Sequence, residues 1–143
     1  MEAFESFLAR AKLTNEIEEQ IALYKQAVAL VIGPFLDDIY AGWAMLERDR
    51  LSQVYLTALL TLSELLLKQA QPEEALAACQ RALEYDIAFE AAYALSMLIY
   101  DRMGDRASII RTYQACVDAL NRQLGLPPSN DTEQLYRRLI AKS

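Results

Sequence analysis

The chain has 143 residues, of which 54% are apolar, and it contains few glycines and prolines. It is long enough to bury a core without disulfides or metals, and it is too apolar to be intrinsically disordered. The formal net charge of −6 disfavours a surface that binds nucleic-acid phosphates.

The chain contains no histidine, the side chain most often used for acid–base catalysis and metal ligation at neutral pH. A Ser–His or Cys–His nucleophile pair is therefore excluded within it. We expect no enzyme, no cofactor and no bound metal. The two cysteines, Cys79 and Cys116, lack metal-ligand spacing and fall on apolar helix positions. This favours buried free thiols over a disulfide or a redox pair.

No segment has the pattern of a membrane span or a secretion signal. The longest uncharged run extends from Leu51 to Ser63, 13 residues, whereas a membrane helix needs about 20 apolar residues. The N-terminus is acidic before it is apolar, unlike a signal peptide. We expect a soluble, cytoplasmic protein.

Apolar side chains recur at helical spacing along most of the chain. The pattern predicts helices over about 3–13, 16–31, 43–69, 72–85, 88–103 and 106–124, and a last helix from about 131. For the second helix, Asn15 and Glu18 have the spacing of a capping box, and Gly33-Pro34 is a stop signal. Its predicted inner face holds Ile17, Ile21, Tyr24, Ala27 and Val28.

The later helices have clear start and stop signals. Pro72 fits the first position of its helix. Gly104-Asp105 combines a helix stop with an N-cap, and Gly125 ends the next helix. Asn130 and Glu133 have capping-box spacing for the last helix.

The helices form a repeat with the period of tetratricopeptide units, about 34 residues per helix pair. Second helices align at this offset: Ala75, Cys79 and Ala82 correspond to Ile109, Tyr113 and Cys116. First helices also align: Leu59, Leu62 and Leu66 correspond to Tyr93, Ser96 and Tyr100. We predict one all-α domain over residues 1–143, with about seven helices in tetratricopeptide-like antiparallel pairs stacked as an α-solenoid.

An earlier, degenerate copy of the repeat is separated from these by an interruption that carries a more specific resemblance. The matching elements are Gly33-Pro34-Phe35-Leu36, Trp43, Glu47-Arg48, Arg50-Leu51, Pro72-Glu73-Glu74-Ala75-Leu76, Gly104-Asp105-Arg106, Tyr113, and Leu124-Gly125-Leu126-Pro127-Pro128-Ser129. In their order and spacing, the chain resembles the bacterial transcriptional activator domain. That domain is the tetratricopeptide-like helical part of regulators related to the Streptomyces antibiotic regulatory proteins.

The resemblance implies a protein-interaction or effector domain of a transcriptional regulator, acting by contact rather than catalysis. Family members usually carry a DNA-binding domain ahead of this unit, so we expect this chain to be excised from a longer regulator rather than to be a stand-alone relative. Expected partners are that neighbouring domain, a second protomer or another protein. DNA would be bound by the full-length regulator and not by this segment. The alternative is a generic tetratricopeptide adaptor without a link to transcription.

Stacked helix pairs leave a concave face, and the repeat frame predicts which residues line it. These are Thr57, Leu60, Glu64, Leu67 and Lys68 in one unit, and Ala91, Ala94, Leu98, Asp101 and Arg102 in the next. We expect a groove for a partner peptide or helix, with Leu60, Leu67 and Leu98 as apolar anchors. Alternatively, the last helix or the N-terminal helices cover these residues.

A second candidate contact lies at the start of the long helix. Trp43, Arg48 and Arg50 are possible contacts with a neighbouring DNA-binding domain, because Trp and Arg are frequent interface anchors. The alternatives are a core position for Trp43 and a solvated face with local ion pairs for the charged run 47–50.

Overall fold

The computed structural model describes residues 2–30 and 45–142, which form seven α-helices and no strand. The helices are α1 (Glu2–Leu13), α2 (Ile17–Ala29), α4 (Met45–Lys68), α5 (Pro72–Tyr85), α6 (Glu90–Met103), α7 (Arg106–Leu124) and α8 (Asn130–Ala141). The prediction of an all-α chain is confirmed.

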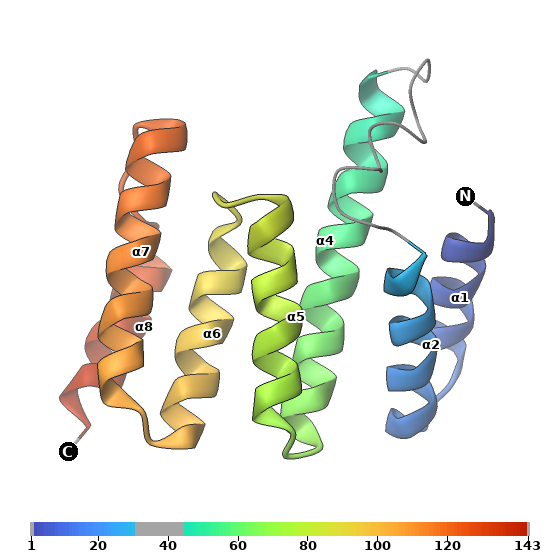
Figure 1. Cartoon of the computed structure of the whole chain (residues 1–143), viewed down its shortest axis with the longest axis horizontal. Coiled ribbons are helices and arrows are strands. Elements are labelled where there is room, and N and C mark those ends of the chain that lie inside the picture. The colour runs from blue at the N-terminus through green and yellow to red at the C-terminus, as the bar shows by residue number, and fades with distance from the viewer. Residues whose placement is uncertain (1, 31–44, 143) are drawn as a thin grey trace.

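Successive helices stand side by side in a row, with the N-terminal pair at one end and α8 at the other (Figure 1). Antiparallel pairs form between α1 and α2, α4 and α5, and α6 and α7. α4 also contacts α6, and α6 also contacts α8, so the first helices of successive pairs are neighbours. This is the arrangement of a helical repeat protein, as predicted.

Burial confirms the repeat register. Of the aligned second-helix positions, Ala75, Cys79, Ala82, Ile109 and Cys116 are all at most 2% exposed. Small residues at these places let the two helices of a pair approach closely. The sixth aligned position, Tyr113, is half-buried and packs against the cluster of Met97, Ile109 and Leu139.

Glycines end two helices in the predicted places. Gly104 has φ = 73° and Gly125 has φ = 65°, in the left-handed region that side chains disfavour. The next residue after Gly104, Asp105, then caps α7 by accepting a hydrogen bond from the backbone N–H of Ser108 at 3.1 Å. The stop and the cap are thus confirmed at adjacent residues. The predicted Gly33-Pro34 stop lies outside the described residues.

Two predicted caps are wrong by one residue. α2 begins at Ile17, so Glu16 and not Asn15 is its N-cap residue, and it makes no side-chain cap hydrogen bond. The Thr14 hydroxyl instead accepts from the Glu16 N–H at 3.3 Å. Similarly, α8 is capped by Ser129, whose Oγ accepts from the Thr132 N–H at 3.3 Å. Hydroxyls and amides at adjacent positions compete for the same role, and the sequence pattern does not separate them.

The two cysteines are buried and free, as expected. Cys79 lies beside Ser63, with 3.2 Å between Sγ and Oγ, and Ser63 also donates to the carbonyl oxygen of Ala75 at 2.7 Å. Burial raises the pKa of the Cys79 thiol and raises that of Cys116 to about 12. Both thiols therefore stay protonated inside the core at neutral pH.

No helix within residues 2–30 and 45–142 combines the length and the apolar content needed to cross a membrane.

Candidate functional site

The predicted concave face lies on α4 and α6, which contact each other. On α4, Leu60 and Leu67 are half-buried and pack against the core. The other three predicted α4 residues, Thr57, Glu64 and Lys68, are exposed. All five predicted positions on this helix therefore retain access to solvent.

On α6, Leu98 is 36% exposed, and Ala91 and Arg102 are also exposed. Ala94 and Asp101 are half-buried. Leu98 is an apolar side chain at the surface of an otherwise well-packed helix, and the neighbouring Met97 and Ile99 are fully buried.

The last helix covers only part of this face. α8 packs against α6, and Lys142, directly after α8, donates from Nζ to Asp101 Oδ2 at 2.9 Å. At the other end of α8, the Ser129 hydroxyl and N–H both donate to Glu90 Oε2, at 2.7 and 2.8 Å. Asp101 thus has an intramolecular partner, whereas Leu98 stays accessible.

Thr57 also borders a pocket that the sequence did not indicate. The pocket lies between α1, α2 and α4 and has a volume of about 330 Å³. Its apolar lining consists of Leu8, Tyr24, Val54 and Ala58. Its polar lining consists of Lys12, Arg50, Gln53, Thr57 and Thr61.

Arg50, one of the possible interdomain contacts, is engaged within the chain. Its Nη2 donates to Glu47 Oε1 at 2.7 Å and to Glu5 Oε1 at 2.8 Å, and its Nε donates to Glu47 Oε2 at 3.1 Å. The guanidinium thereby links α4 to α1, and it lowers the pKa of the Glu47 carboxyl. The other two candidates, Trp43 and the Arg48 side chain, lie outside the described part of the structure.

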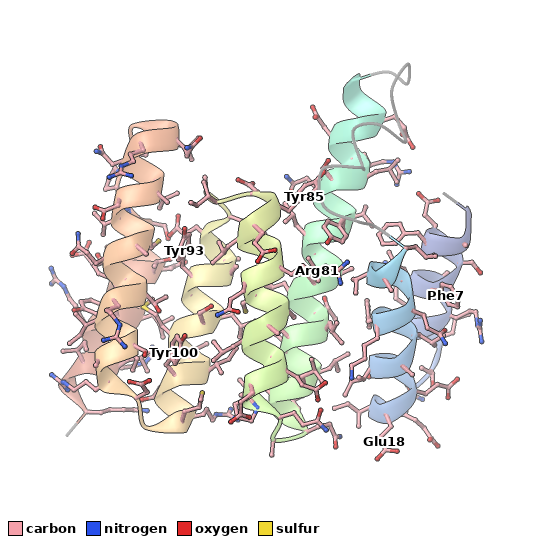
Figure 2. The ribbon with its side chains drawn as sticks, viewed as in Figure 1. Phe7, Glu18, Arg81, Tyr85, Tyr93 and Tyr100 are labelled. Carbon is pink, nitrogen blue, oxygen red and sulfur yellow. The ribbon has the colours of Figure 1, made fainter. Side chains whose placement is uncertain are left out.

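Side chains of α5 fix the N-terminal pair against the rest of the molecule. Arg81, which Figure 2 labels on α5, donates from Nη2 to the Val28 carbonyl oxygen at 2.9 Å near the C-terminal end of α2. Lys25 of α2 pairs with Glu74 of α5 at 3.1 Å. The Tyr85 hydroxyl lies 2.7 Å from Ser52 Oγ of α4. Two walls of the pocket, α2 and α4, are therefore held in place by a fourth helix, α5.

The resemblance of the sequence to the bacterial transcriptional activator domain is confirmed by a family model. The sequence model of the bacterial transcriptional activator domain matches residues 1–140, nearly the whole chain. The chain belongs to the bacterial transcriptional activator domain family. No curated protein and no solved structure matched it.

In this bacterial transcriptional activator domain, the α4–α6 face stays a prediction, and the sequence did not indicate the pocket. Tyr24 falls on the apolar stripe of its helix, so periodicity assigns it to the core, and it is only 8% exposed. Lys12, Gln53 and Thr61 lie on polar faces of their helices and carry no motif. Only the packing of α1 and α2 against α4 brings these side chains together, so the sequence pattern holds no signal for the site.

Proposed function

We propose that this domain acts by contact within a bacterial transcriptional regulator and binds a protein partner through its α4–α6 face. It is not an enzyme in this proposal, and it works in the cytoplasm as one domain of a longer chain. The partner is the regulator's own DNA-binding domain, a second protomer or another protein. The family membership supports the link to transcription.

We choose the α4–α6 face because the apolar side chain of Leu98 is exposed to solvent there. Leu98 and the exposed Arg102 lie on α6, and the half-buried Leu60 and Leu67 lie on α4, which contacts α6. An apolar centre with a polar rim is typical of a protein-binding site. Amphipathic helices bind such faces by inserting apolar side chains at helical spacing.

A one-hybrid experiment tests this proposal. The domain is fused to an unrelated DNA-binding domain, and transcription from a reporter with the matching operator is measured in a bacterial host. Leu98→Glu places a charge in the proposed contact and should reduce activation about five- to thirtyfold, since it removes an anchor worth on the order of 1–2 kcal/mol.

Ile110→Glu is the matched control, because Ile110 is an apolar residue of α7 that is 43% exposed and lies away from the α4–α6 face. It should leave activation unchanged at equal protein levels. Equal loss in both variants would argue against this face as the contact. No activation by the wild-type fusion would favour the alternative, a helical-repeat adaptor without its own role in transcription.

A further inference from the structure

The pocket between α1, α2 and α4 has the dimensions of a small-molecule site. Its volume of about 330 Å³ lies at the lower end of the range for ligand pockets. Along α4 it extends from Arg50 to Thr61, which corresponds to about 16 Å at the helical rise per residue. An extended chain of eight carbon atoms is shorter than this and fits within the pocket. The pocket shares only Thr57 with the α4–α6 face, so a ligand bound in it is independent of the proposed function.

A buried hydroxyl without a partner among the described residues lines this pocket. Tyr24 is 8% exposed, and its hydroxyl makes no hydrogen bond with any of them. Burial alone raises its pKa. Buried tyrosine hydroxyls normally find a partner, as Tyr93 does by donating to the Ile87 carbonyl oxygen at 2.8 Å. Among the described residues, the Tyr24 hydroxyl is therefore a donor that still lacks an acceptor.

The same pocket contains an uncommitted positive charge. Lys12 lines it and forms no ion pair within residues 2–30 and 45–142. The other cation, Arg50, already binds the carboxylates of Glu47 and Glu5. A phenol donor and an available ammonium group in one pocket favour an anionic acceptor over a neutral or cationic one.

The rest of the lining is apolar. Leu8, Val54 and Ala58 face the pocket from α1 and α4. Such a surface favours a hydrocarbon body, because its burial removes apolar area from water on both sides.

We infer that this pocket binds a small amphipathic carboxylic acid. Its hydrocarbon part lies against Leu8, Val54 and Ala58, and its carboxylate accepts hydrogen bonds from the Tyr24 hydroxyl and the Lys12 ammonium group. Because the ligand contacts three helices, its binding couples the N-terminal pair to the long helix α4. The pocket would thereby make the stability of this junction depend on the concentration of the acid.

Titration of the whole chain with sodium octanoate, followed by backbone amide chemical shifts, tests this inference. An eight-carbon acid has ten heavy atoms, so its ligand efficiency leads us to expect saturable binding with a dissociation constant in the low millimolar range or tighter. The largest shifts should map to α1, α2 and α4 around the pocket. 1-Octanol, with the same chain and no charge, should bind at least about tenfold more weakly.

Two variants probe the polar groups. Tyr24→Phe removes only the hydroxyl, and Lys12→Gln removes the charge and keeps a shorter polar side chain; each should weaken octanoate binding about tenfold. The matched controls are Tyr100→Phe and Lys68→Gln, since Tyr100 is half-buried on α6 and Lys68 is an exposed lysine of α4 outside the pocket. Both controls should bind octanoate like the wild type. Lys12 is exposed, so its replacement leaves the fold intact even if Tyr24→Phe does not.

Three results would each overturn the inference. The first is the absence of saturable octanoate binding at concentrations up to about 10 mM. Ligand efficiency predicts a dissociation constant below this value for a ligand with ten heavy atoms. The second is equal binding of octanol and octanoate. The third is octanoate binding that neither Tyr24→Phe nor Lys12→Gln weakens, because the acid would then occupy a different part of the surface.

Discussion

Two buried tyrosines of this domain differ in whether their hydroxyls have a partner. Tyr24 is 8% exposed with no hydrogen bond among the described residues, and Tyr93 is 5% exposed and donates to the Ile87 carbonyl oxygen. A buried polar group destabilises the folded state when it has no hydrogen-bond partner, and it stabilises the folded state modestly when it has one. The same substitution should therefore have opposite effects at the two positions.

Without ligand, Tyr24→Phe should leave the free energy of unfolding unchanged or raise it by up to about 1 kcal/mol. Tyr93→Phe should lower it by about 1 kcal/mol, because the Ile87 carbonyl loses its donor. Urea denaturation followed by circular dichroism measures both values. A clear destabilisation by Tyr24→Phe would mean that its hydroxyl is paired after all and would weaken the case for the pocket.

Because of the buried thiols, the free energy of unfolding should depend on pH in the alkaline range. The folded-state pKa of Cys116 is raised to about 12 by burial and, to a smaller extent, by Glu90. A thiol in the unfolded chain ionises near pH 8.5, so unfolding releases a proton above that pH. The contribution of Cys116 is fully present below about pH 8.5 and is lost as pH rises towards 12.

The unfolding free energy should fall above pH 9, and Cys116→Ala should make that fall shallower, by up to about 1.4 kcal/mol per pH unit. Urea denaturation at a series of pH values between 7 and about 10 measures the two slopes. Identical slopes would show that Cys116 is accessible enough to ionise in the folded state.

At the scale of elements, the cap of α8 also forms its contact with α6. Ser129 accepts from the Thr132 N–H, and its own hydroxyl and N–H donate to Glu90. These bonds lower the pKa of Glu90, although its partial burial acts in the opposite direction. One residue thus sets both where α8 begins and where it is attached.

Ser129→Ala should therefore destabilise the domain by about 1–2 kcal/mol, whereas Asn130→Ala should cost less than about 0.5 kcal/mol. Asn130 is exposed and is the first residue of the helix rather than its cap. Thermal denaturation of the two variants distinguishes them. A larger effect at Asn130 would restore the capping box that the sequence suggested.

Helix positions could be predicted from the sequence because apolar spacing and strong end signals agree. Gly104 and Gly125 end their helices at the predicted residues, and Pro72 begins α5. Caps were less predictable, since Thr14 and Ser129 lie next to equally suitable asparagines. The repeat register placed the proposed contact residues on α4 and α6, and their role in binding stays a prediction. The pocket could not be predicted, because it depends on how α1 and α2 approach α4, and no local pattern encodes that approach.

At the scale of the whole molecule, charge is unevenly distributed. Residues 101–143 carry seven Lys or Arg against five Asp or Glu, although the chain as a whole has a net charge of −6. Several of these cations are engaged within the domain: Arg137 pairs with Glu133, Lys142 pairs with Asp101, and Arg106 donates to backbone carbonyls of Ile140 and Lys142. These three cations are therefore engaged within the domain.

The domain alone should therefore not bind duplex DNA. Fluorescence anisotropy of a labelled 20-base-pair duplex should show no saturation up to about 100 µM protein at roughly 50 mM salt, where basic domains bind measurably. Binding that weakens steeply with added salt would contradict this and would place a phosphate contact at the C-terminal end.

The packing order of the helices has a consequence for how such domains evolve. Each helix packs mainly on its neighbours along the chain, with α4–α6 and α6–α8 contacts joining successive pairs. A gene that gained or lost one complete helix pair would replace one set of interfaces with an equivalent set, whereas a change of half a pair would leave an apolar face uncovered. Insertions and deletions in the lineage of this domain should therefore come in units of about 34 residues.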